Sequence, residues 1–206
     1  MKASGTGAAI VLAAALATLA VPASRAAEVA GVELDDSIEL GGALLQLNGA
    51  GERTLYVVRT YVAALYVARP SSQAQALLGQ AGPRRLSLTM LAALSTDWVV
   101  ERIVAAMREN MGDQAFALLQ PRLARLLEPL VSLERLQKGD RVDVDAIDGS
   151  IRVSVDGRAL GAEAPGGDVF DALLRAFIGE RPLDAALGRA LLGLPPPKDA
   201  AGNRGT

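Results

Sequence analysis

The 206-residue chain is long enough for one domain, and its 21 basic and 23 acidic residues give a net charge of −2. It contains neither cysteine nor histidine, which excludes disulfides, Ser-His-Asp and Cys-His catalysis, and metal sites held by imidazole or thiolate. The slight acidic excess argues against a nucleic-acid partner, which would favour a basic face.

The N-terminus has the pattern of a secretory signal peptide. Lys2 precedes an apolar stretch over 8–21, and small residues follow up to Ala27. An uncleaved anchor would need about 20 apolar residues, so we predict a cleaved signal over 1–26. Cleavage takes away two of the 21 bases and no acid, which leaves 19 bases against 23 acids and a net charge of −4. We therefore expect a periplasmic or secreted protein with no membrane span after processing.

The next segments favour β-strands. Residues 28–49 carry short alternating apolar runs broken by paired aspartates and glycines, typical of two or three antiparallel strands. Residues 54–68 read as one long strand that ends before Pro70. Both faces of that strand are largely apolar, so we expect it to be central in a sheet or covered on each side.

The second half of the chain mixes helices with a hairpin. Asp148-Gly149 is well suited to a tight turn between two strands. Pro121 and Pro129 are expected to break or kink a helical stretch over 113–137. The remaining predicted elements are a short helix over 71–80, a strand over 84–91, a helix from the Ser95 region to Met111, and two helices that begin near Asp168 and Pro182.

This order of elements predicts an α+β fold, with an antiparallel β-sheet covered by a helical layer on one side. We see no repeat and no second domain. The expected organisation is a signal peptide over 1–26, one domain over 27–194, and a disordered tail over 195–206, where proline and polar residues gather. The sequence does not indicate an oligomeric state.

Three strings carry a resemblance to a known family: "LLQLNGAGERTLYVVRTYVAALYV", "KGDRVDVDAIDGSIRVSVDGRALG" and "GGDVFDALLRAFIGERPLDAALGRALLG". In combination they span nearly all of the mature chain. The sequence resembles the chalcone isomerase-like family, which includes bacterial secreted proteins, plant chalcone isomerases and plastid fatty-acid-binding proteins. The resemblance implies an open-faced sandwich, in which a cleft lies between the sheet and the helices.

Arg53 is the first residue to which the resemblance gives a role. Family members place an arginine after the "GAG" string, where it contacts the substrate in the enzymes and a carboxylate in the fatty-acid binders. A guanidinium keeps its charge when desolvated, and its planar fork matches a carboxylate or an enolate-like oxygen. Gly49 and Gly51 are expected to turn the backbone tightly at this point. The alternative use of Arg53 is a salt bridge, to Glu52 or Asp36.

Tyr61 and Trp98 are the other candidate ligand-binding residues. Tyr61 stands where the enzymes carry threonine and the fatty-acid binders tyrosine, and its phenol can donate a hydrogen bond to a carboxylate. The alternative for Tyr61 is plain core packing, with its hydroxyl at the rim. If the strand is straight, Arg53 and Tyr61 lie about 26 Å apart on one face. Arg59 is also an odd-numbered residue of the predicted strand, so it is expected on the same face, where it could support or replace Arg53 in binding the ligand. By the resemblance, Trp98 stands at the position of the enzymes' catalytic tyrosine. Its indole is expected either to form a wall of the cleft or to anchor the core.

The enzymes' other polar positions fall on Glu101, where they carry lysine, and on Ala105, where they carry asparagine. A glutamate in the place of the lysine would repel a phenolate or an enolate. We therefore predict a non-catalytic protein that binds a small amphipathic acid such as a fatty acid, with no cofactor and no metal. An intramolecular lyase (isomerase) of the chalcone isomerase type and a structural or interaction module stay open as alternatives. A calcium loop in "DVDAIDG" does not have the required ligand spacing.

Overall fold

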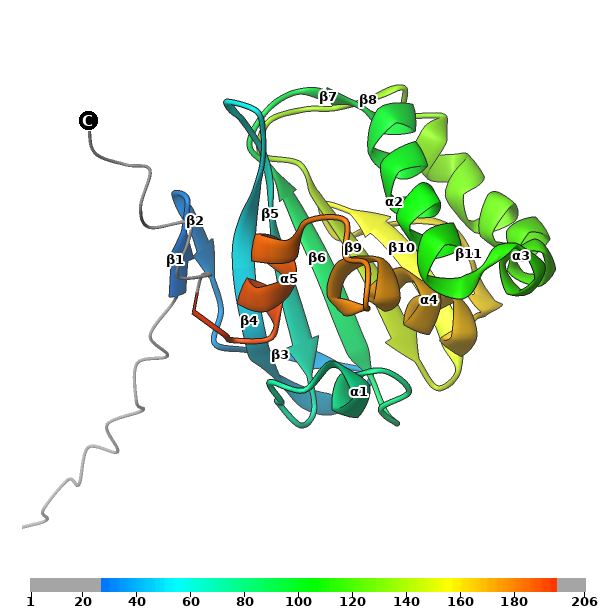
Figure 1. Cartoon of the computed structure of the whole chain (residues 1–206), viewed down its shortest axis with the longest axis horizontal. Coiled ribbons are helices and arrows are strands. Elements are labelled where there is room, and N and C mark those ends of the chain that lie inside the picture. Colours follow the sequence, from blue (N-terminus) through cyan, green and yellow to red (C-terminus); the bar gives the residue numbers. More distant parts are fainter. Residues whose placement is uncertain (1–26, 196–206) are drawn as a thin grey trace, which may run out of the picture.

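The computed structural model describes residues 27–195 (Figure 1). The strands are β1 (Ala27–Val29), β2 (Val32–Leu34), β3 (Ser37–Leu40), β4 (Ala43–Leu55), β5 (Val58–Val67), β6 (Arg84–Met90), β7 (Leu94–Ser95), β8 (Arg135–Leu136), β9 (Arg141–Ile147), β10 (Ser150–Val155) and β11 (Arg158–Pro165). The helices are α1 (Ala74–Leu77), α2 (Thr96–Met111), α3 (Asp113–Val131), α4 (Gly167–Ile178) and α5 (Ala185–Leu191). The predicted signal peptide lies outside the described residues.

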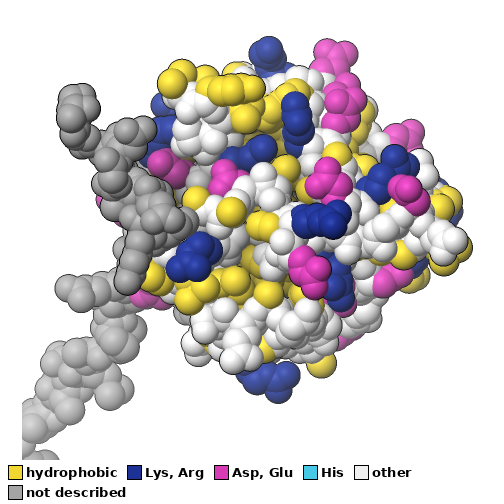
Figure 2. All heavy atoms as spheres, viewed as in Figure 1, with side chains coloured by type: hydrophobic (Ala, Val, Ile, Leu, Met, Phe, Trp, Pro, Cys, Tyr) yellow, Lys and Arg dark blue, Asp and Glu magenta, His cyan; other side chains and the backbone are white. Residues whose placement is uncertain are grey.

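Seven strands form one antiparallel sheet in the order β11-β10-β9-β6-β5-β4-β3. Helices α2 to α5 form a layer over one face of this sheet (Figure 1), and charges of both signs are scattered over the helical face in Figure 2. The predicted α+β class, with an antiparallel sheet and a helical layer, is confirmed.

Strand β5 lies near the middle of the sheet and is buried on both faces, as its apolar pattern predicts. Tyr61 and Leu65 point into the core beneath the helices. Val62 and Tyr66 alternate with them and point into a smaller core under the β1–β2 hairpin. Since neighbouring residues on a strand face opposite sides, each residue of β5 is committed to one of these two cores.

Gly49 and Gly51 lie within β4, where they allow α5 to approach the sheet. A Cβ atom on Gly49 would lie 2.2 Å from the Ala190 carbonyl oxygen, and one on Gly51 would lie 2.6 Å from the Ala190 Cβ. The expectation of a tight turn at these glycines is wrong. The neighbouring Asn48 fastens the contact, because its Nδ2 donates to the Leu191 carbonyl at 2.7 Å.

Helix α3 continues through both of its prolines and ends at Val131, so a break at either proline and the predicted extension to 137 are wrong. Its leucines form a buried stripe that includes Leu119, Leu123 and Leu126, and this packing offsets the backbone hydrogen bonds that the prolines remove. Strand β11 was not predicted, since its Gly-Ala-rich sequence has little strand signal. Between residues 27 and 195, no helix is both long and apolar enough to cross a membrane.

The close approach of α5 to β4 gives a stability prediction. Gly49→Ala is expected to lower the free energy of unfolding by about 1–3 kcal/mol, because the added methyl group meets the α5 backbone. Gly167→Ala is the control, since a methyl group added there would lie at an ordinary contact distance of 3.9 Å from its nearest neighbouring atom. Urea unfolding measures both, and equal stability of the two variants would contradict the prediction.

Candidate functional site

Arg53 and Tyr61 are direct cross-strand partners. The segment predicted as one long strand turns back on itself at Tyr56 and Val57, so that β4 and β5 form a hairpin. The Arg53 Cζ atom lies 5.9 Å from the centroid of the Tyr61 ring. The expected separation of about 26 Å, which assumed a straight strand, is therefore wrong, and the two predicted binding residues are in contact.

The turn escaped the sequence analysis because its residues favour strands. Tyr56 adopts a φ of 54° and is 93% exposed, and Val57 is 92% exposed. Aromatic and β-branched residues are typical of strand interiors, whereas a positive φ is usually signalled by Gly, Asn or Asp. Neither Tyr56 nor Val57 carries that signal.

A β-bulge at Thr60 decides which side chains accompany Arg53. The register steps from Arg53↔Tyr61 to Thr54↔Arg59, so Thr60 is the extra residue, and its hydroxyl donates to the Arg53 carbonyl at 2.8 Å. Because the bulge shifts the alternation by one residue, Arg59 turns to the face opposite Arg53. The expectation that Arg59 supports Arg53 is wrong, and Arg59 instead pairs with Glu52 at 2.6 Å.

Trp98 completes the group around Arg53. Helix α2 begins at Thr96, and the Ser95 hydroxyl caps it by accepting from the Trp98 N–H. The partly buried indole lies 5.8 Å from the Arg53 Cζ atom. Contacts between a guanidinium and an aromatic face contribute about 0.5–2 kcal/mol each. We call Arg53, Tyr61 and Trp98 the Arg53 site.

Arg53 is a buried residue whose guanidinium has no counter-ion nearby in the described part of the chain. The residue is only 7% exposed, and no carboxylate of residues 27–195 lies within 4.0 Å of it. Glu52, one of the two salt-bridge partners considered from the sequence, is engaged by Arg59 on the other face. Buried charges are normally paired because desolvation disfavours them, so this unpaired guanidinium is a candidate anion-binding group.

Tyr61 adds an unused donor to the site. The residue is fully buried, and its hydroxyl has no hydrogen-bond partner of good geometry within the described chain. Burial raises the pKa of Tyr61 to about 12, an effect that the neighbouring Arg53 guanidinium partly opposes. The phenol therefore keeps its proton at neutral pH and can donate it to an acceptor.

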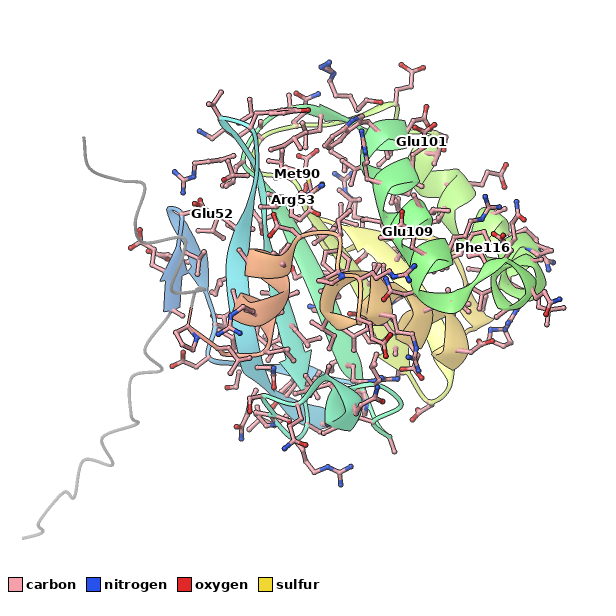
Figure 3. All side chains as sticks on the ribbon, in the orientation of Figure 1. Glu52, Arg53, Met90, Glu101, Glu109 and Phe116 are labelled. Atoms are coloured by element: carbon pink, nitrogen blue, oxygen red, sulfur yellow. The ribbon has the colours of Figure 1, made fainter. Side chains whose placement is uncertain are left out.

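Met90 connects the Arg53 site with an apolar cavity under the helices. Met90 pairs with Tyr61 on the next strand, and Figure 3 shows it close to Arg53. Met90 also lines a wholly apolar cavity of about 50 Å³ between the sheet and α2, α3 and α4, which we call the core cavity. Sequence analysis missed Met90, because alternation along β6 shows its face but not its cross-strand neighbour.

Glu101 and Ala105 lie away from Arg53. Both line an open groove of about 610 Å³ between α2 and α3, which we call the α2–α3 groove. Figure 3 shows Glu101 and Glu109 on α2 and Phe116 from α3 along this part of the molecule. The two positions at which the enzymes carry lysine and asparagine therefore present no polar side chain to Arg53.

The acids of the "DVDAIDG" string form ion pairs on the opposite face of the sheet. Asp145 accepts two hydrogen bonds from Arg85, at 2.6 and 2.8 Å, and Asp143 accepts one from Ser87 at 2.6 Å. Arg141 and Arg152 also pair with these carboxylates. Across residues 27–195, no group of three or more acids is arranged to hold a metal ion. These carboxylates join the strands of the sheet.

Comparison with known proteins agrees with this architecture. The family model described as chalcone isomerase-like matches residues 26–193. The chain belongs to the chalcone isomerase-like family. A crystal structure of a fatty-acid-binding protein from Arabidopsis thaliana has a TM-score of 0.59 to this chain at 16% identity, covering 79% of this chain and 92% of its own. That likeness shows the shared fold. A search of curated protein sequences found no match.

The unpaired state of Arg53 predicts an unusual stability effect. Arg53→Met is expected to lower the free energy of unfolding by less than about 1 kcal/mol, because two cation–π contacts are exchanged for relief from burying an unpaired charge. Arg84→Met is the matched control: Arg84 is 5% exposed but pairs with Asp171 at 2.6 Å.

We expect this control to lose about 2–4 kcal/mol, somewhat less than a fully buried pair loses, since the Asp171 side chain is 28% exposed. Urea unfolding of both variants measures the difference. A larger loss in Arg53→Met than in Arg84→Met would mean that Arg53 serves stability.

The raised pKa of Tyr61 predicts a loss of stability at high pH. From about pH 10 to 12 the unfolded chain releases the phenolic proton while the folded chain retains it, so the free energy of unfolding falls as pH rises. The loss is at most about 3 kcal/mol. Tyr61→Phe removes the contribution of Tyr61 to this pH-dependent loss. The contribution of Tyr66 remains, since burial also raises the pKa of Tyr66 to about 12. Urea unfolding at pH 9 and 11.5 gives the loss of unfolding free energy between these two pH values. An equal loss in wild type and in Tyr61→Phe would refute the prediction.

Proposed function

We propose that this protein is an exported, non-catalytic binder of a small amphipathic carboxylate such as a fatty acid. One observation carries the proposal: a buried arginine without a counter-ion within 4.0 Å lies against a buried phenol without a hydrogen-bond partner in the described chain, and Met90, the cross-strand partner of that phenol, lines an apolar cavity. A carboxylate satisfies both groups, since its two oxygens can accept from the Arg53 fork and from the Tyr61 hydroxyl. The apolar tail of the same ligand extends past Met90.

The surroundings favour an acyl chain over a flavonoid. Aromatic residues make up only 3% of the chain, and the core cavity is lined by aliphatic side chains and methionine. The solved plant structure of the same fold is that of a fatty-acid-binding protein. By the resemblance, Tyr61 also corresponds to the tyrosine that the fatty-acid binders carry, where the enzymes carry threonine.

The chalcone isomerase reaction has less support. That reaction needs a positioned phenolate and donors for the developing enolate. The residue at the position of the catalytic tyrosine is Trp98, and Glu101 and Ala105 line the α2–α3 groove. The Arg53 site therefore offers one cation and one neutral phenol, which suits binding of an anion more than proton transfer.

Export forms part of the proposal. It is supported by Lys2, the apolar stretch over 8–21 and the small residues before Ala27. A periplasmic or secreted carrier would work without disulfides, as the absence of cysteine requires. The protein to be tested is accordingly the mature chain from Ala27 onward.

The binding test compares two neighbouring arginines. The delipidated mature protein is titrated with palmitate by calorimetry, with Arg53→Ala as the test and the exposed Arg59→Ala as the matched control. We expect wild type and Arg59→Ala to bind equally. Arg53→Ala is expected to bind about 10–100-fold more weakly, as loss of a charge-assisted hydrogen bond predicts. Equal affinities in Arg53→Ala and wild type, or no binding to either, would overturn the proposal.

A catalytic assay separates binding from lyase activity. Chalcone absorbance is followed in the presence of wild type and Arg53→Ala at the same concentrations. We expect both to match the buffer rate. A wild-type rate above that background, lost in Arg53→Ala, would show that the protein is an enzyme.

A further inference from the structure

The core cavity is too small for the tail of a fatty acid. Its volume of about 50 Å³ is far below the range of about 300–1,000 Å³ found for ligand pockets. The lining is entirely apolar and closely packed, so a long chain can be held only if it continues beyond this cavity. The question is where the remaining methylene groups lie.

The α2–α3 groove lies directly outside the core cavity. Four side chains line both: Val100 and Val104 from α2, and Leu123 and Leu127 from α3. These four residues, which we call the partition, are the apolar layer that separates the cavity from the groove. The groove offers about 610 Å³, which brings the combined space into the range of ligand pockets.

The charges at the rim of the groove decide which end of an amphipathic acid can lie there. Glu101, Glu109 and Glu128 line the groove, against a single cation, Arg108. Arg108 is already engaged, since it lies 5.0 Å from the Phe116 ring and 3.6 Å from the Asp113 carboxylate. Like charges repel a carboxylate at this rim, whereas an acyl chain meets an apolar floor. The groove therefore accepts the tail and disfavours the head group.

Helix α3 meets α2 around the partition through aliphatic side chains, and its Arg122 pairs with Asp168 of α4. Pro121 and Pro129 lie inside α3, and each removes one backbone hydrogen bond of the helix. Its buried stripe meets the core through leucines, and contacts between aliphatic side chains have little directional preference. Separation of the two helices by a small distance opens the partition without breaking a hydrogen bond between them.

We infer that a bound long-chain acid passes from the Arg53 site through the partition, and that its distal methylene groups lie in the α2–α3 groove. This inference rests on the proposed function and adds a chain-length rule to it. The Arg53 site fixes the carboxylate, and the groove distinguishes long acyl chains from short ones. Short acids end before the partition and do not sense the groove.

The first test fills the groove from α3. Ala124→Trp places a bulky side chain in the groove, and Ala117→Trp places one at another exposed position of α3 that does not line it. Kd values for decanoate and palmitate are measured for both variants and for wild type. We expect Ala124→Trp to raise the Kd for palmitate at least tenfold and the Kd for decanoate less than twofold. Ala117→Trp should match wild type for both acids.

A direct measurement locates the chain end. The protein has no cysteine, so Ala105→Cys on α2 and the control Ala117→Cys on α3 can each be labelled once with a small fluorophore. Stearate that carries a nitroxide at carbon 16 should quench the Ala105→Cys label at least twofold more than the Ala117→Cys label. A nitroxide at carbon 5 should show no such preference.

The outcomes separate this inference from the function on which it rests. If Arg53→Ala abolishes palmitate binding while Ala124→Trp leaves it unchanged, or weakens both acids alike, the groove inference fails and the proposed function stands. Equal quenching of the two labels also refutes the groove inference. If wild type binds neither acid, both fail, and the groove is then open to other occupants such as an amphipathic helix of another protein.

Discussion

The cross-strand register between Arg53 and Tyr61 is the constraint on which the rest of the site depends. Side chains on a strand alternate between faces, so a slip of one residue would turn Arg53 toward the face where Glu52 pairs with Arg59. There a guanidinium would be neutralised and half-exposed. The hairpin turn at Tyr56 and the bulge at Thr60 instead leave Arg53 alone beneath the helices, facing a phenol and an indole. The charge is thus isolated by backbone geometry.

The two layers of the fold have different roles around this isolated charge. The sheet is held by hydrogen bonds between neighbouring strands, and on its outer face Arg85 bridges Asp143 and Asp145. Such directional contacts fix the position of Arg53 and Tyr61 closely. On the helical side, α5 is fastened to β4 through Gly49 and Gly51, whereas α2 and α3 cover the cavity by aliphatic packing. The sheet thus carries Arg53 and Tyr61, and the helical layer supplies Trp98 and the aliphatic cover of the cavity.

The sequence could predict what depends on local patterns. Alternation and helical spacing predicted the layers, and the resemblance pointed to Arg53, Tyr61 and Trp98. The features that the sequence could not predict, the turn, the bulge and the role of two glycines, depend on how the strands and helices meet in space. Tyr56 and Val57 look like strand residues and form a turn, and Thr60 looks regular and forms a bulge that sends Arg59 to the other face. Gly49 and Gly51 were expected to turn the chain, yet their role follows from α5, which lies more than 130 residues later.

An unpaired buried cation lowers the stability of the fold, and native domains are stable by only about 5–15 kcal/mol in total. The aromatic contacts of Arg53 reduce this cost without removing the charge. They also leave the guanidinium free to form hydrogen bonds, since a ring face occupies none of its five N–H groups. A carboxylate in the same place would have stabilised the fold and blocked the site. Stacking on Tyr61 and Trp98 therefore leaves the buried Arg53 with its N–H groups available, which is the combination that the proposed binding of an amphipathic acid requires.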